Sequence, residues 1–267
     1  MLTRSPLNQC APRGLAARAG ALGLVALGAV LASTLAVPAL ASATPTVSAT
    51  AKILPIPHFA HTGNCLGCGA DLETTFTISG TEYAGGPPPL TNVKVYFPKG
   101  TKITTKGFPT CSPSAVERGG IGACKKGKAG SGSSEGFVSL GGERVPETVE
   151  VTPFFANGGG LGFWIEGSSP VKIEKLAKGT WSYPASGPVI NVEVPLIETL
   201  PGAPDASATH IISKAGGAIK KGHKTTYYGT IPRTCPKGGF PGKAELTFFE
   251  AGTVTVTTTI PCPPKKK

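Results

Sequence analysis

Polar and apolar residues alternate along most of the chain, beginning near residue 70. Successive side chains of a β-strand point to opposite faces, so a period of two buries one face and leaves the other in water. The pattern therefore predicts an all-β protein, and its many short strands favour an antiparallel β-sandwich. The alternation is clearest in the segments 70–78, 92–97, 149–155, 190–196 and 246–260.

Clusters of glycine and proline separate these segments, as in the turns at 85–89, 98–100 and 157–160. Such clusters end strands, because glycine adopts backbone angles that other residues avoid and proline lacks a backbone donor. Residues 127–136, with the sequence GKAGSGSSEG, have the composition of a flexible loop.

At most one short helix is expected outside the N-terminal segment. Ser112 can cap it, Pro113 suits its first position and Gly119 can end it.

The first 43 residues have the features of a secretory signal peptide. A basic start with Arg4, Arg13 and Arg18 precedes an uncharged apolar run over 20–37, and small residues then offer cleavage after Ala41 or Ala43. The alternative is an uncleaved membrane anchor, since the run is near the length that spans a bilayer.

The rest of the chain is expected to contain one large β unit. Residues 44–57 are expected to be a short tether, 58–200 the main β-sandwich and 264–267 a basic tail. Residues 201–263 would add C-terminal strands, either packed on the sandwich or forming a small second sheet. Four strands over about 60 residues are marginal alone, so disulfides or packing on the first part should support them.

The chain is basic, with 26 Lys and Arg against 15 Asp and Glu and a formal net charge of +11. Lysines gather at 125–128, 220–221 and 265–267. They are either solvated loop residues or residues that attract an anionic cell-envelope polymer or glycan. Nucleic acid is not an expected partner, because these clusters lack interleaved aromatic residues and a reading helix.

An even number of cysteines follows the leader, which in an exported protein indicates disulfide bonds. Six cysteines allow fifteen connectivities. Their positions around turns and strand ends favour a local scheme: Cys65–Cys68, Cys111–Cys124 and Cys235–Cys262.

The stretch HFAHTGNCLGCGA, residues 58–70, offers another chemistry for the first pair. His58, His61, Cys65 and Cys68 have a spacing that permits tetrahedral zinc. Because exported thiols tend to oxidise, a disulfide-tied loop is favoured and no metal or cofactor is predicted. Zinc is the alternative.

Two glycine-rich matches to catalytic motifs lack the context they require. Residues 132–136 fit G-x-S-x-G, but an apolar strand does not precede them, as a nucleophile elbow needs. Residues 158–162 are followed by a strand-like segment, whereas a phosphate-binding loop needs a helix.

No catalytic residue is predicted from the remaining titratable groups. His210 and His223 stand alone and are expected at the surface. Paired carboxylates could support glycoside hydrolysis, and the candidates for such a pair are Glu143, Glu147, Glu150, Glu166 and Asp205.

Five aromatic residues lie in the middle of the chain: Phe154, Phe155, Phe163, Trp164 and Trp181. Core packing is the favoured interpretation, because an alternating strand sends every other side chain inward. The alternative is an aromatic platform that faces sugar or lipid.

Three stretches resemble a group of exported actinobacterial proteins of unknown function: LPIPHFAHTGNC (54–65), PPPLTNVKVYFPKGTKI with GFPTC (87–111) and YYGTIPRTCPKGGFPGKAELTF (227–248). The resemblance spans roughly 52–263 and implies secretion. It implies no activity, and no functional residue follows from it.

The sequence thus predicts a secreted or envelope-associated, non-catalytic β-sandwich with a binding or structural role and no membrane span after cleavage. The alternative is a secreted hydrolase acting on polysaccharide or ester.

Overall fold

The computed structural model describes residues 44–263, so the expected signal peptide (1–43) and basic tail (264–267) lie outside the described range. The two helices in this range are α1 (Pro113–Gly119) and the short 3-10 helix η1 (Ile121–Cys124). The strands are β1 (Thr46–Leu54), β2 (Gly69–Ser79), β3 (Leu90–Tyr96), β4 (Lys102–Ile103), β5 (Gly130–Leu140), β6 (Glu143–Phe155), β7 (Leu161–Gly167), β8 (Ile173–Ser182), β9 (Val189–Glu193), β10 (Ser207–Ala215), β11 (Ala218–Lys221), β12 (Lys224–Tyr227), β13 (Gly229–Thr230), β14 (Phe240–Phe248) and β15 (Gly252–Ile260).

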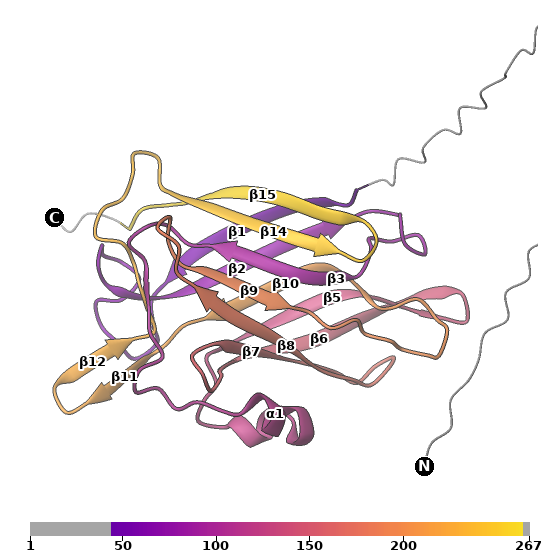
Figure 1. Ribbon diagram of the computed structural model, residues 1–267, viewed down its shortest axis with the longest axis horizontal. Coiled ribbons are helices and arrows are strands. Elements are labelled where there is room, and N and C mark those ends of the chain that lie inside the picture. Colours follow the sequence, from indigo (N-terminus) through magenta and orange to yellow (C-terminus); the bar gives the residue numbers. More distant parts are fainter. Residues whose placement is uncertain (1–43, 264–267) are drawn as a thin grey trace, which may run out of the picture. The chain divides into compact units, whose positions relative to one another are not determined.

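Most strands of the described range belong to one 13-stranded sheet, in the order β15-β14-β3-β9-β8-β7-β6-β5-β10-β2-β13-β4, with β1 also paired to β2. β1 lies against β15, so the sheet folds back on itself (Figure 1). Inward side chains of β2 pack with those of β3 and β14 in one core cluster, which places β2 opposite these strands. The prediction of an all-β antiparallel sandwich with one short α-helix is confirmed.

The tether expected over 44–57 is instead largely the strand β1, which pairs along its whole length with β2. Val47 and Ala49 pack against the cluster around Phe76, and Ala51 and Ile53 against the one around Phe240. Their spacing of two already predicts a strand, but the small alanines weaken the pattern.

The prediction of a flexible loop over 127–136 is also wrong, because β5 begins at Gly130 and lies between β6 and β10. A Cβ on Gly130, Gly132 or Gly136 would overlap backbone carbonyl groups of β10. These glycines therefore allow the two backbones to approach closely, and the composition that resembles a flexible loop serves strand packing.

Most of the C-terminal strands pack in the main sheet, and two of them form a separate small sheet. β10 lies between β5 and β2, and β14 pairs with β3, so these strands complete the main sheet. β11 and β12 form a separate two-stranded sheet.

Helix α1 covers the outer face of the sheet. Ser112 and Pro113 occupy the expected N-cap and first positions, although the Ser112 side chain makes no capping hydrogen bond. Val116 is fully buried in a cluster with Phe154 and Trp164. These two aromatic side chains therefore point away from the interior and are covered by the helix. No helix within residues 44–263 is both long and apolar enough to cross a membrane.

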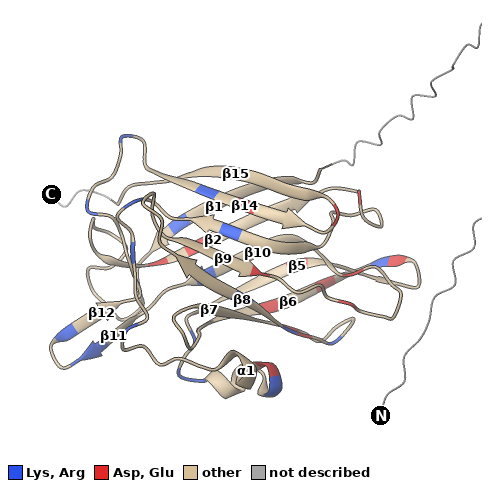
Figure 2. Ribbon diagram, in the orientation of Figure 1, with Lys and Arg blue, Asp and Glu red and all other residues tan. Residues whose placement is uncertain are grey.

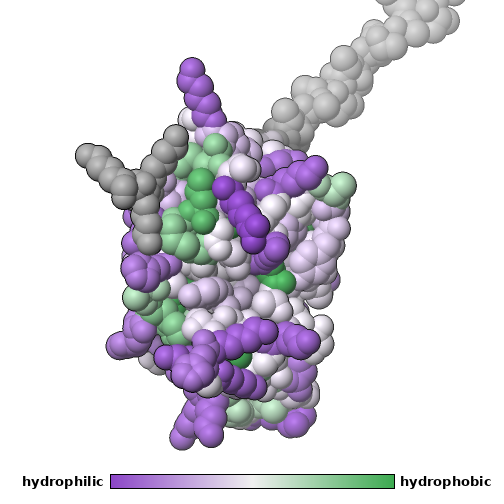
Figure 3. Space-filling view, turned by 90° about the vertical axis from the view of Figure 1, so that its left-hand side faces the viewer, coloured by the Kyte–Doolittle hydropathy of each residue, from purple (hydrophilic) through white to green (hydrophobic). Residues whose placement is uncertain are grey.

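The two lysine clusters within residues 44–263 are exposed. Lys125, Lys126 and Lys128 follow η1, and Lys220 and Lys221 lie on β11 near the tip of its hairpin. Figure 2 shows this hairpin as a basic part of the molecule, and hydrophilic side chains cover much of the end seen in Figure 3.

Cysteine pairs at disulfide distance confirm the prediction of disulfide bonds. Three are present in residues 44–263, and they are the pairs that the sequence favours: Cys65–Cys68, Cys111–Cys124 and Cys235–Cys262. Cys111–Cys124 ties α1 and η1 to the sheet, and Cys235 packs with Ile231, Phe240 and Ile260.

Replacing both Cys235 and Cys262 with Ser should destabilise the protein more than replacing both Cys65 and Cys68. The first bridge spans 27 residues and the second spans three. Loop-closure entropy assigns them about 3.5 and about 2 kcal/mol, respectively. Thermal unfolding under non-reducing conditions measures the difference, and an equal or larger loss for the Cys65–Cys68 variant would contradict it.

Candidate functional site

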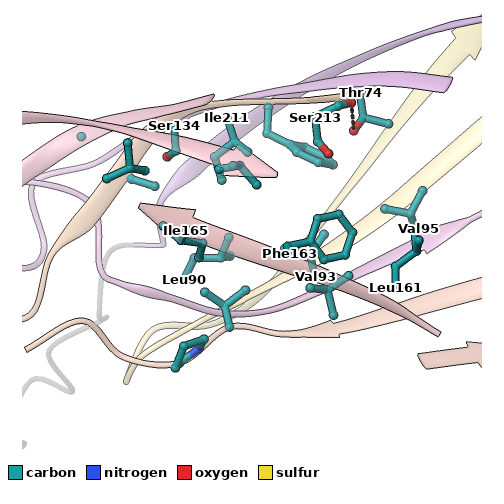
Figure 4. Close-up of a pocket in the computed structure, with 18 of the residues that line it drawn as sticks. Thr74, Leu90, Val93, Val95, Ser134, Leu161, Phe163, Ile165, Ile211 and Ser213 are labelled. Carbon is teal, nitrogen blue, oxygen red and sulfur yellow. Dashed lines mark hydrogen bonds between the residues drawn. The ribbon is translucent and has the colours of Figure 1, made fainter. Parts of the chain in front are cut away.

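The interior of the sandwich contains an apolar cavity of about 220 Å³. Inward side chains of β2, β5 and β10 line one side and those of β3 and β7 the other, and in Figure 4 Thr74, Ser134 and Ile211 lie opposite Phe163 and Val93. Val192 packs against several core clusters and is still not fully buried. It lines the cavity, and so do Leu72, Phe76, Val95, Val149, Val151, Leu161, Ile165, Ile190 and Val194.

This volume is far larger than an ordinary packing defect. Protein interiors are close-packed, with few voids larger than a water molecule. Cavities in protein cores lower the free energy of unfolding in proportion to their volume. By that relation, an empty void of 220 Å³ would lower it by about 5 kcal/mol. That is a large share of a domain's stability of about 5–15 kcal/mol.

One end of the cavity is aromatic. Trp181 lies 5.2 Å from Phe97, centroid to centroid, and its indole Nε1 donates a hydrogen bond of 2.9 Å to the Tyr228 hydroxyl. Burial raises the pKa of Tyr228, so its hydroxyl keeps its proton. The hydrogen bond fixes the indole in the cavity wall.

The other end is polar. Glu147 on β6 pairs with Gly136 of β5, and Ser207 on β10 pairs with the neighbouring Phe137. Glu147 and Ser207 therefore lie on the two strands that flank β5, opposite successive residues of β5, and both line the cavity. β7 runs from this end to the aromatic end. Its length gives a distance of roughly 20 Å between them, because a strand extends by about 3.3 Å per residue.

Glu147 is a buried carboxylate with an incomplete set of partners. Its exposed fraction is 6 %, and its Oε2 accepts a hydrogen bond of 3.4 Å from the Val171 backbone N–H. Its Oε1 has no hydrogen-bond partner among residues 44–263. Burial raises the pKa of Glu147, and the Val171 hydrogen bond offsets part of that rise. The carboxyl group therefore weakens the fold where it sits.

Glycines pack closely on both sides of this carboxyl group. Gly136 on β5 lines the cavity beside Glu147 without a side chain, and a Cβ on it would overlap the Ser207 carbonyl. On β7, a Cβ on Gly167 would lie 2.8 Å from Glu147 Oε1. The positions that side chains would take are thus filled by the Ser207 carbonyl and by the Glu147 carboxyl group itself.

Residues 194–206 close the polar end. The Val194 N–H donates to the Thr91 carbonyl and the Ala206 N–H to the Ile197 carbonyl, each at 2.9 Å. Leu196 lines the cavity and is also 37 % exposed. Leu196 therefore borders both the cavity and solvent.

The zinc alternative at residues 58–68 does not match the geometry. Cys65 and Cys68 form a disulfide, so the two thiolates that it requires are absent from this part of the described chain. His58 and His61 are exposed loop residues. No group of three or more His, Cys, Asp or Glu within residues 44–263 could hold a metal ion.

Of the acidic candidates, Glu147 alone lines the cavity in the described range. Glu150 and Glu166 pair across β6 and β7 on the outer face, and Glu166 accepts a hydrogen bond from Trp164. Glu143 is exposed at a strand end, and the backbone N–H of Asp205 donates to the Tyr83 hydroxyl.

The other catalytic candidates are not grouped together in one site. His210 is on β10, where its ring contacts the Thr77 hydroxyl at 3.2 Å, and His223 is exposed between β11 and β12. The G-x-S-x-G match puts Ser134 in the middle of β5, which is not the strand-to-helix turn of a nucleophile elbow.

The central aromatic residues separate into three groups. Phe154 and Trp164 are buried under α1, Phe155 is in the core, and Phe163 and Trp181 line the cavity. Trp181 also borders a surface groove of about 620 Å³, where Tyr183 stacks on it at 6.5 Å and is 63 % exposed.

Sequence reasoning missed Ser207, Gly136 and Gly167 as parts of a site, because their pairing depends on strand register. A signal for Glu147 was present. It interrupts an alternating inward series on β6, between Val145 and the residues Val149, Val151 and Pro153, so an acid stands where the pattern expects an apolar residue.

No protein-family model, curated protein or solved structure matches this chain. Function is therefore inferred from the chemistry of the cavity itself.

Replacing Glu147 with Gln should stabilise the protein increasingly as the pH rises. The folded state holds the Glu147 proton to a higher pH than the unfolded chain does, because burial raises its pKa. Stability that is present at low pH is thus lost as the pH rises through the folded pKa. The Tm difference between Glu147→Gln and wild type should be small at about pH 4 and larger at about pH 8.

The control is Glu150→Gln, which removes an exposed carboxylate from the same strand. A Tm difference for Glu147→Gln that does not change with pH, or a variant less stable than wild type at the higher pH, would contradict the account.

Proposed function

We propose that this protein is an exported binding module that holds a small apolar molecule inside its sandwich. The supporting observation is the apolar cavity of about 220 Å³ between its two layers. Small-molecule sites are concave and mostly apolar, with a few polar groups that fix orientation. The cavity has this composition, with Glu147 and Ser207 as polar groups in its lining.

The size of the cavity limits the ligand. An engineered cavity of about 150 Å³ binds benzene, so a cavity about 1.5 times larger corresponds to roughly nine carbon atoms. In Figure 4, Phe163 and Val93 lie on one side of the cavity, opposite Ile211. The ligand class is therefore a medium-length alkyl or small cyclic group.

Binding is favoured over hydrolysis by the chemistry of the lining. Glycoside hydrolysis uses two carboxyl groups, and a serine hydrolase needs a base in contact with its nucleophile. Among the described lining residues, Glu147 is the one carboxylate, and histidine is absent.

The proposal of export depends on the cysteines and the N-terminal segment. Disulfides persist in oxidising compartments and are rare in the cytosol, and all six cysteines of the described range are paired. Together with the leader-like residues 1–43, this supports secretion or envelope association. The resemblance to exported actinobacterial proteins stays a prediction.

Replacing Val192 with Phe should weaken the binding of toluene or butylbenzene by at least about tenfold, because even one methylene changes binding in an apolar pocket by this much. It should also raise the Tm, since the ring fills part of the cavity. Ligand-induced Tm shifts and Trp181 fluorescence report binding. Thr148→Phe, on the exposed outer face of β6, is the control. Wild-type protein that binds neither compound would refute the proposal.

A second candidate function is contact with a cell-envelope glycan in the surface groove, favoured by the exposed stack of Tyr183 on Trp181. Aromatic faces bind apolar faces of sugars, and Asn157 and Lys178 in the same groove supply polar groups.

Tyr183→Ala should then reduce retention on an insoluble envelope glycan several-fold without changing the binding of toluene in the cavity. A pull-down with Tyr83→Ala as the matched tyrosine control measures this. Unchanged retention of the Tyr183 variant would exclude the groove.

A further inference from the structure

We propose that the polar end of the cavity binds the hydrogen-bond-donating head group of an amphiphile, an alcohol or an amine, with Glu147 as the acceptor and Ser207 as a second partner. This inference rests on the proposed function, because the head group can reach Glu147 only if the apolar part of the ligand occupies the cavity.

The first support is the free acceptor. Glu147 is more than nine-tenths buried, and its Oε1 has no hydrogen-bond partner among the described residues. Buried polar atoms in native proteins are nearly always paired, so Oε1 needs a partner that the described residues do not supply. An ionised carboxylate only accepts hydrogen bonds, so the bound group must donate.

The second support is Ser207, whose exposed fraction is 3 % and whose Oγ also has no partner within residues 44–263. A serine hydroxyl both donates and accepts. Two unpaired polar side chains thus line a mostly apolar cavity, on strands that are both neighbours of β5. A hydroxyl or amine bound at this end would donate to Glu147, and Ser207 can serve as a second partner for it.

The third support is the absence of competing side chains beside the acceptor. Gly136 and Gly167 flank Glu147 on the two adjacent strands, and Gly167 lies close to its Oε1. A larger side chain at either glycine would displace the Ser207 carbonyl or the Glu147 carboxyl group. The surroundings are closely packed, which favours a head group of one or two heavy atoms over a bulky one.

The charges of the lining exclude a fatty acid. The described lining contains no Lys, Arg or His, so a carboxylate head would face Glu147 without a compensating cation. Like charges in a low-dielectric site repel strongly. The cavity should therefore discriminate against a carboxylate head group.

The tail then lies along the strands toward Trp181. Inward side chains of β7 (Leu161, Phe163 and Ile165) lead from the polar end to the aromatic end. The volume corresponds to a tail of roughly eight to nine carbons. Trp181 lines the cavity whereas Trp164 is buried under α1, so Trp181 fluorescence reports occupancy.

The test compares four eight-carbon probes, 1-octanol, octylamine, octanoate and n-octane, by calorimetry and by Trp181 fluorescence. Wild type should bind the alcohol and the amine at least about tenfold more tightly than octane, the discrimination expected for satisfying a buried polar group. Octanoate should bind most weakly.

Glu147→Leu should reduce octanol and octylamine binding about tenfold, while octane binding stays the same or improves. Glu147→Gln keeps an acceptor, so it should retain octanol and lose much of the amine affinity. Ser207→Ala should reduce octanol binding less than Glu147→Leu does. Glu150→Leu on the exposed face is the control, and circular dichroism verifies that each variant is folded.

The outcomes separate the two proposals. If octane binds as tightly as octanol, or if Glu147→Leu leaves octanol binding unchanged, the head-group inference is wrong and the apolar cavity still stands. Tight binding of octanoate would also overturn the inference. If none of the four probes binds to wild type, the proposed function itself fails.

Discussion

The close approach of β10 to β5 is the constraint on which the rest of the structure depends. Gly130, Gly132 and Gly136 bring the two backbones together where any side chain would overlap a carbonyl group. This contact joins β6–β5 to β10–β2 in one ladder and lets the sheet fold back until β1 meets β15. The enclosed space is an interior with two opposed layers, and the cavity is the part of that interior that side chains leave unfilled.

The same contact determines where the polar end lies. Pairing of β5 with both β6 and β10 brings Glu147 and Ser207 opposite successive residues of β5, with Gly136 between their strands. A buried acid without a cationic partner weakens a fold, and a large apolar cavity does the same. Their coincidence in one place is the basis of the proposed binding function. Trp181 and Tyr228 at the other end supply rigid aromatic walls, so the two ends differ in chemistry.

Much of the fold follows from period-two alternation. It predicts strands such as β2, β3, β9 and β14, and the caps predict α1, because these signals are local. The strands β1 and β5 were missed because small residues and glycines weaken local hydrophobic patterns, and their stability comes from packing on β2 and β10. The polar end depends on register between β5, β6 and β10, which one sequence does not specify. Glu147 is the exception, since an acid in the inward series of β6 is visible in the sequence itself.

The central claim is that the interior holds an accessible apolar site. Xenon enters dry apolar cavities of this size, so xenon-pressurised crystals of residues 44–263 test the claim most directly. The account predicts a xenon atom between the layers, against Val192, Phe163 and Ile211. Density for ordered water throughout the interior, or a collapsed core that admits no xenon, would contradict it.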